Sequence, residues 1–319
     1  KTFLVANNRT VGLFLPTKTA TRARVPRTPD LAEMIGDYKG RKTIAAGEAF
    51  DVSPENIEKN TVRLTLRSGL KVALLPKKTR GEAVNLAMTL RYGTPKTLQG
   101  QAIAGGFLPT LMTRGTKRLN RTQLTDKLAE LRASLSGSGD RRSPGEAVFS
   151  IQTTRSNLPA VLELLRQVLR EPVLPEKELA LMKQQALTGF EQQKSEPQPL
   201  ALRKLRRTFR PYPKTDPLYE PTIEEEIAAV RAVTREQIVA LYDEMLNGVH
   251  GELAIVGDFN PETTTPALEK LVDGWNSQAR YQHVARRGDL PYKPGSSKVL
   301  TPDKANAVYF SGLVFPMKD

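Results

Sequence analysis

Residues 62–74 read VRLTLRSGLKVAL. Apolar and polar side chains alternate over residues 62–66, a pattern typical of a strand with one buried face. Ser68-Gly69 then favours a tight turn, and a second apolar run follows until Pro76 closes it. The stretch therefore predicts two strands joined by a turn, which open the folded part of the chain.

Three further strands are indicated downstream. Apolar and polar residues alternate at 84–90 and again at 147–151. Leu253 and Ile255 form a last run, which closes at a Gly-Asp turn. The short connections between the first three strands favour an antiparallel sheet in which they are neighbours.

Helix starts are marked by capping residues. Ser156-Asn157 predicts one cap, and a longer helix after Pro175 should end before Pro197. Strands, helix, strand, helices and strand, in that order, predict an α+β fold: a mostly antiparallel sheet with helices packed on one face, flanked by extended linkers. Capping boxes predict three more helices, at Asn120 with Gln123, at Thr222 with Glu225, and at Thr234 with Gln237.

Proline- and charge-rich stretches divide the chain. Strand-like runs near both ends, Thr10–Leu15 and Ala307–Phe315, are each too short to form a domain alone. We therefore expect them to belong to neighbouring repeat domains. The expected segments are the end of a preceding repeat (1–17), a linker (18–58), an α+β domain (59–278), and a linker with the first strand of a following repeat (279–319).

Composition limits the classes of function. The chain has 48 Lys and Arg against 34 Asp and Glu, a formal net charge of +14, and no cysteine, which excludes disulfides, thiolate metal sites and a cysteine nucleophile. No apolar run approaches the length of a membrane span. The positive charge attracts polyanions such as nucleic acid. The densest basic run, residues 203–210, has a helical pattern, however, and we interpret it as a solvated face.

Several short sequence segments, in a fixed order, resemble a known family. They are residues 67–81, Leu90–Gly93 and Gly115–Arg118. They resemble the pitrilysin/insulinase family of zinc peptidases, and specifically the non-catalytic C-terminal half of a long bacterial member. The resemblance implies repeated α+β domains in two halves that close around a chamber. It also implies that the catalytic half of the same polypeptide is the partner of this chain and carries zinc.

The zinc motif of that family, His-x-x-Glu-His, is absent from the place where the resemblance puts it. Active members bind zinc through the two imidazoles and use the glutamate as general base. Aligned through Gly115-Thr116, the corresponding positions here are Gly106, Pro109 and Thr110, expected near a helix start. None of the three offers an imidazole or a carboxylate, so neither ligand nor base is expected.

The remaining candidate metal ligands are isolated side chains. Glu191 matches the downstream ligand of the family, with Gln184 at the place of a second glutamate. The reading we favour is a solvent-facing helical carboxylate, because one carboxylate holds zinc poorly. His250 and His283 have no metal-ligand spacing with each other. No catalytic residue, metal ligand or cofactor is therefore expected in this chain.

These features together favour a catalytically inactive half of a zinc metalloendopeptidase. It would help to enclose and hold peptide or unfolded-protein substrates, and its positive charge would favour acidic peptide segments. Two alternatives stay open: an assembly module that binds no peptide, and a basic nucleic-acid-binding protein, which is the least favoured. The resemblance implies a periplasmic location, with the cytoplasm as the alternative.

Overall fold

The computed structural model describes residues 46–275, 279–288 and 290–314, together with residues 9–13, 16, 18, 19, 30, 34 and 36. The chain divides into two compact units, Lys1–Thr43 and Ile44–Asp319. The helices and strands with defined bounds run from Pro54 to Val272, all within the second unit.

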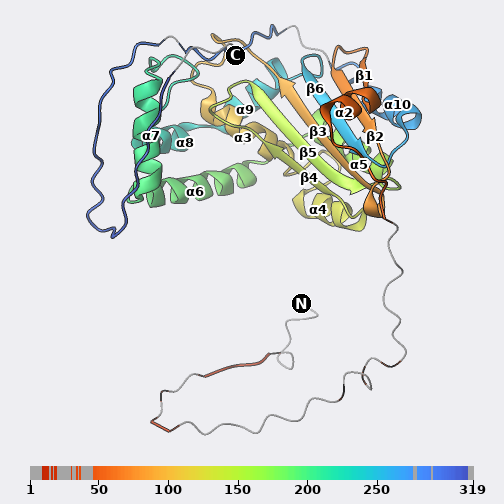
Figure 1. Cartoon of the computed structure of the whole chain (residues 1–319), viewed down its shortest axis with the longest axis horizontal. Helices are drawn as coiled ribbons and strands as arrows, with labels where there is room; N and C mark the ends of the chain where they lie inside the picture. Colours follow the sequence, from red (N-terminus) through yellow and green to blue (C-terminus); the bar gives the residue numbers. More distant parts are fainter. Residues whose placement is uncertain are drawn as a thin grey trace. The chain divides into compact units, whose positions relative to one another are not determined.

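A six-stranded sheet forms the centre of the second unit (Figure 1). Its order is β1-β2-β6-β3-β5-β4, and only the β2–β6 pair is parallel. The predicted α+β fold with a mostly antiparallel sheet is confirmed. The strands are β1 (Val62–Thr65), β2 (Lys71–Pro76), β3 (Ala83–Arg91), β4 (Ser134–Ser138), β5 (Glu146–Thr154) and β6 (Gly251–Gly257).

Two features of the sheet differ from the prediction. β2 and β3 are not neighbours, because β6 lies between them, parallel to β2 and antiparallel to β3. The strand from the far end of the domain thus fills the middle of the sheet. β4 has a Ser-Leu-Ser-Gly-Ser sequence with a single large apolar residue, so alternation did not indicate it. Such a sequence suits an edge strand, which is paired on one side only.

One face of the sheet is buried and the other is open. The register places Leu86 of β3 opposite both Ile151 and Ile255, and all three are buried. The residues between them, such as Ala87 and Ala254, are exposed. This is the two-residue period expected when helices cover only one face.

Helices pack on the buried face of the sheet, and α6, α7 and α8 lie beside the sheet (Figure 1). α5 and α10 pack together, α3 lies against β4 and β5, and α9 packs on α3. α6 pairs with α8. The helices are α2 (Pro54–Asn60), α3 (Ala102–Met112), α4 (Arg121–Glu130), α5 (Leu158–Arg170), α6 (Glu176–Gln193), α7 (Pro197–Phe209), α8 (Ile223–Ala232), α9 (Arg235–Glu244) and α10 (Pro261–Val272).

The predicted caps have mixed outcomes. The capping boxes of α4 and α8 are confirmed in full. At α9 only half of the box forms, because the Gln237 side chain donates to Gln101 instead of returning to the cap. Asn157 sits at the N-cap of α5 without capping it, since its amide donates to the Leu131 carbonyl.

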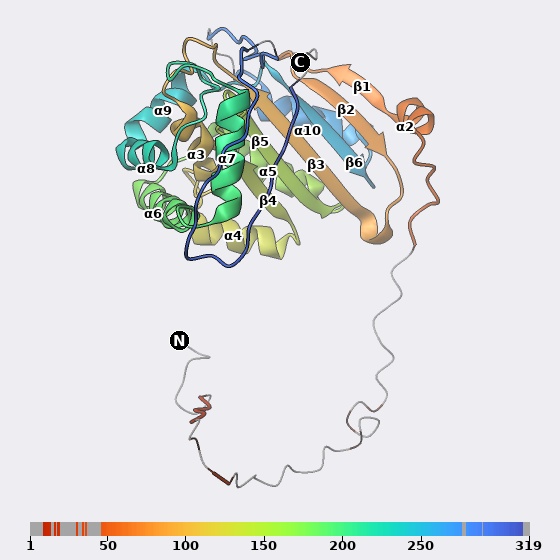
Figure 2. The same cartoon turned by 60° about the vertical axis from the view of Figure 1, so that its left-hand side comes forward.

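The expected terminal strands are not formed where the structure describes them. Residues 9–13 and 307–314 have no strand assignment; residues 14, 15 and 315 lie outside the described residues. The C-terminal run instead passes along α7 (Figures 1 and 2). Lys304 pairs with Glu196 at 2.7 Å, and the Tyr292 ring meets Phe209 edge-on at 5.4 Å. A strand needs a paired neighbour to form, and this run has none among the described strands.

Candidate functional site

The three positions that stand in place of a zinc motif lie on α3. The helix begins at Ala102, so Gly106, Pro109 and Thr110 occupy its middle and second half. The expected helix start is therefore wrong by about one turn. Leu108, Leu111 and Met112 of the same helix are fully buried. The helix is thus fixed in the core, between the sheet and α9.

The face of α3 that bears these positions is a packing surface. The Thr110 hydroxyl donates to the Gly137 carbonyl of β4 at 2.8 Å. A Cβ added to Gly137 would lie 2.2 Å from the carbonyl oxygen of Pro109, so helix and strand meet at backbone distance. Gly106 and Pro109 carry no metal-binding atom on their side chains, and the one hydroxyl is already bonded. Zinc, which takes imidazole, thiolate or carboxylate ligands, does not fit the residues present here.

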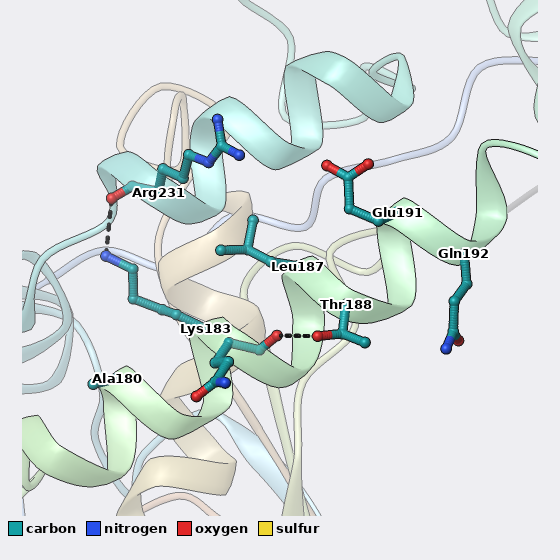
Figure 3. A pocket seen from close by; sticks show the side chains of 8 residues that line it. Ala180, Lys183, Leu187, Thr188, Glu191, Gln192 and Arg231 are labelled. Atoms are coloured by element: carbon teal, nitrogen blue, oxygen red, sulfur yellow. Dashed lines mark hydrogen bonds between the residues drawn. The ribbon is translucent and has the colours of Figure 1, made fainter.

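Glu191 and Gln184 lie elsewhere, on α6. Both line an open groove of about 690 Å³ between α6 and α8. Figure 3 shows Leu187 and Glu191 projecting towards α8 and Gln192 turned away. Glu191 is paired with Lys194 at 2.8 Å, which agrees with a surface carboxylate. No residue of α3 lines the groove, so the structure does not bring Glu191 together there with the three α3 positions.

The groove has the mixed lining that a peptide requires. Leu187 and Ala180 supply apolar surface, while Gln184 and Thr188 supply an amide and a hydroxyl group. Binding sites commonly combine apolar walls with a few hydrogen-bonding groups. At one end Lys183 donates to the carbonyls of Arg231 and Val233, at 2.9 and 2.7 Å, and so fixes the C-terminal end of α8 to α6.

No metal centre is formed elsewhere in the described part of the chain. There, no group of three or more His, Cys, Asp or Glu side chains has the geometry to hold a metal ion. His250 stacks obliquely on Tyr281, with ring centroids 5.3 Å apart. His283 lines a separate cavity of about 260 Å³ with Arg142 and Arg286. The two histidines thus have different surroundings.

The basic run 203–210 is not uniformly solvated, contrary to the sequence-based interpretation. Arg203 forms an ion pair with Glu226 of α8 at 2.6 Å and donates to the Pro221 carbonyl at 2.7 Å. Arg207 donates to the Glu220 carbonyl at 2.6 Å. Arg203 and Arg207 are spaced i, i+4 and so share one face of α7. That spacing was the available signal that one side of the helix faces protein.

A buried ion cluster joins three parts of the fold. Its carboxylates are Glu226, which has no exposed surface, and Glu220, which is also buried. Arg141, from the loop between β4 and β5, contacts both, with the Glu220 contact at 3.0 Å. Arg203 supplies the second guanidinium. The loop, α7 and α8 are thus held together by buried ion pairs.

The stability contributed by the start of α8 should depend on pH. Lys214 holds the pKa of Glu225 down to about 2 from the usual 4.5, aided by the Thr222 N–H and the Tyr219 hydroxyl. Because the pKa is lowered in the folded state, the stabilisation is complete above pH 4.5 and is lost as pH falls towards 2. We expect Glu225→Gln to be less stable than the parent chain at pH 7, with the difference vanishing near pH 2.

Urea unfolding followed by circular dichroism across this pH range measures the effect. Glu130→Gln, which removes an exposed pair with Lys127, is the matched control. A Glu225→Gln difference that stays constant from pH 7 to pH 2 would contradict the assignment.

Comparison with known proteins finds one family model that matches part of the chain. The family model described as Insulinase (Peptidase family M16) matches residues 74–222. The matched region contains α3, α6 and α7, while α8, with Glu226 and Arg231, lies beyond it. No match is found among curated proteins.

Solved structures share the fold at low identity. A peptidase M16 inactive domain from Pseudomonas fluorescens matches with a TM-score of 0.58 and 18% identity, over 70% of this chain and 53% of that chain. A protease from Helicobacter pylori gives 0.57 and 17%, over 70% and 52%. The periplasmic protease PqqL from Escherichia coli gives 0.53 and 13%, over 87% and 28%. The chain thus spans about half the length of the first two.

Proposed function

We propose that the chain, whose residues 74–222 match the family model described as Insulinase (Peptidase family M16), is a catalytically inactive half of a zinc metallopeptidase. In this role it helps to enclose and hold peptide substrates. A second half of the same polypeptide carries the zinc ion and performs proteolysis. The chain itself supplies binding surface and no reacting group.

The observation that carries the proposal is the state of α3. Where the family motif needs two ligands and a base, this helix has Gly106, Pro109 and Thr110, packed against β4. One neighbouring side chain cannot replace two zinc ligands and a general base together. The match to a peptidase family, in a chain without these groups, supports a holding role, because binding energy remote from the scissile bond can serve catalysis.

We assign peptide holding to the groove beside α6. Its apolar wall and its amide and hydroxyl groups suit an extended peptide with mixed side chains. Among the described residues, no helix combines the length and apolarity needed to cross a bilayer. A periplasmic location is part of the proposal, supported by the likeness to the periplasmic protease PqqL.

The test combines binding and cleavage. An unstructured, charge-balanced peptide labelled with a fluorophore is titrated with the chain, with zinc and with a chelator. We expect saturable binding that the chelator leaves unchanged, and no cleavage. Zinc-dependent cleavage by the purified chain would overturn the proposal. Absence of any peptide binding would instead favour an assembly module that acts through protein contacts alone.

A variant in the groove tests whether the peptide binds there. Leu187→Gln removes apolar surface from the groove wall and should weaken peptide binding about tenfold, the effect of losing roughly 1.4 kcal/mol of apolar burial. Leu181→Gln is the matched control, because Leu181 is 40% exposed on the same helix and does not line the groove. Equal losses in both variants would place the peptide elsewhere.

A further inference from the structure

The guanidinium groups around the C-terminal end of α7 outnumber the carboxylates that face them. The carboxylates there are already paired: Asp140 with Arg142 at 3.2 Å, Glu220 and Glu226 with Arg141 and Arg203, and Glu225 with Lys214 and Arg207. Arg206 and Arg210 remain. Within the described part of the chain, neither of their side chains has a hydrogen bond or an ion pair.

The surroundings of Arg206 are unfavourable for a charge. Its side chain is half-buried. Burial lowers its pKa, and so do the nearby charges of Arg142, Arg141 and Arg210, with only Glu220 acting in the opposite direction. Like charges held this close destabilise a fold unless something compensates them. The C-terminal end of a helix favours positive charge, but its effect is equivalent to only about half an elementary negative charge. The two unpaired guanidiniums together carry two positive charges.

A cavity adjoins this cluster. Arg142, one of the neighbours of Arg206, also lines the space of about 260 Å³ that contains Tyr281 and Ser143. Its lining combines the guanidiniums of Arg142 and Arg286 with the Ser143 hydroxyl, the Tyr281 ring and the Glu146 carboxylate, while Arg206 and Arg210 lie outside the lining. Its size suits an acidic side chain or a chain-terminal carboxylate.

We propose that Arg206 and Arg210, beside the Arg142 cavity, bind the carboxylates of an acidic peptide segment. The inference rests on the proposed function and names the substrate class that this half prefers. Guanidinium groups bind carboxylates through paired, charge-assisted hydrogen bonds. We favour a peptide over a nucleic acid because residues 74–222 match a peptidase family model.

The experiment compares two labelled peptides of equal length, one rich in Asp and Glu and one charge-balanced, at near-physiological salt. The variant is Arg206→Gln with Arg210→Gln. We expect it to weaken binding of the acidic peptide about tenfold or more, the loss of a charge-assisted contact, and to change binding of the balanced peptide less than about twofold. The variant should melt at the same temperature as the parent chain or higher, since an uncompensated charge is removed.

Two matched variants test specificity. Arg67→Gln with Arg80→Gln removes the same charge from exposed arginines on the connections that flank β2, at the opposite edge of the sheet. It should change neither affinity by more than about twofold, because screened surface charge contributes little to a distant contact. Arg206→Lys with Arg210→Lys keeps the charge and should retain part of the preference for the acidic peptide.

The outcomes separate the two ideas. Equal binding of both peptides overturns the acidic preference and leaves the holding function in place. Binding of neither peptide overturns both. Equal weakening by the Arg67/Arg80 variant would reduce the effect to net charge and overturn the site. Tighter binding of a single-stranded oligonucleotide, lost in the Arg206/Arg210 variant, would assign the cluster to nucleic acid instead.

Discussion

Glu226→Ala is expected to lower the free energy of unfolding by about 3–5 kcal/mol, the usual effect of removing one partner from a buried ion pair. Glu226 has no exposed surface and is contacted by Arg141 and by Arg203, the latter at 2.6 Å. Without the carboxylate, two guanidiniums would stay in a poorly hydrated place with only Glu220 beside them. Most of the expected loss is this uncompensated charge.

Urea unfolding followed by circular dichroism measures the change through the transition midpoint. The matched control is Glu130→Ala, which removes an exposed carboxylate paired with Lys127 and should lower stability by less than about 0.5 kcal/mol. Glu226→Gln keeps the shape and one acceptor oxygen, and should lie between the two. Similar losses for Glu226→Ala and Glu130→Ala would mean that the cluster is hydrated, contrary to its burial.

The cluster also determines where the proposed peptide contacts lie. α7 has one buried residue, Pro197, so apolar packing alone does not hold it. Arg203 and Arg207 attach it to α8 and to the segment before α8. If Glu226→Ala releases α7, Arg206 and Arg210 lose their position as well. The acidic preference should then fall with the stability, while binding in the α6 groove is affected less.

The sequence predicted the parts of this architecture that depend on local pattern. The buried strand β3 and the capping box at Asn120 follow from period and spacing, which neighbouring residues determine. The position of β6 between β2 and β3 could not be predicted in this way. It depends on pairing between residues far apart in the chain, and no local pattern encodes it.

The prediction of a solvated face at residues 203–210 was wrong for a related reason. Arg203 lies in a run that counts as strongly basic, yet its partner Glu226 is on another helix and Arg141 is on a loop between strands. A sequence lists charges without showing which are paired. The absence of ligand side chains at Gly106, Pro109 and Thr110 needed no pairing information, because residue type alone excludes imidazole and carboxylate. What only the structure adds is the close approach of β4 to that helix.

This close approach gives the second large effect: Gly137→Ala is expected to lower the free energy of unfolding by about 2–3 kcal/mol, as overpacking does in a rigid core. The new Cβ would lie 2.2 Å from the Pro109 carbonyl oxygen and 2.8 Å from its carbon. Both are backbone atoms, so no side-chain rotation relieves the clash. Helix and strand must separate, which also strains the bond from Thr110 to the Gly137 carbonyl.

Gly189→Ala is the matched control, since Gly189 lies within α6 with no neighbouring heavy atom inside 4 Å of the added Cβ. It should raise stability by about 0.5–1 kcal/mol, because alanine favours a helix more than glycine does. Opposite signs for the two variants, measured by urea unfolding, would confirm that α3 meets β4 at backbone distance. A tolerated Gly137→Ala would mean that this contact is loose. Space beside Pro109 and Thr110 would then be available for a larger side chain.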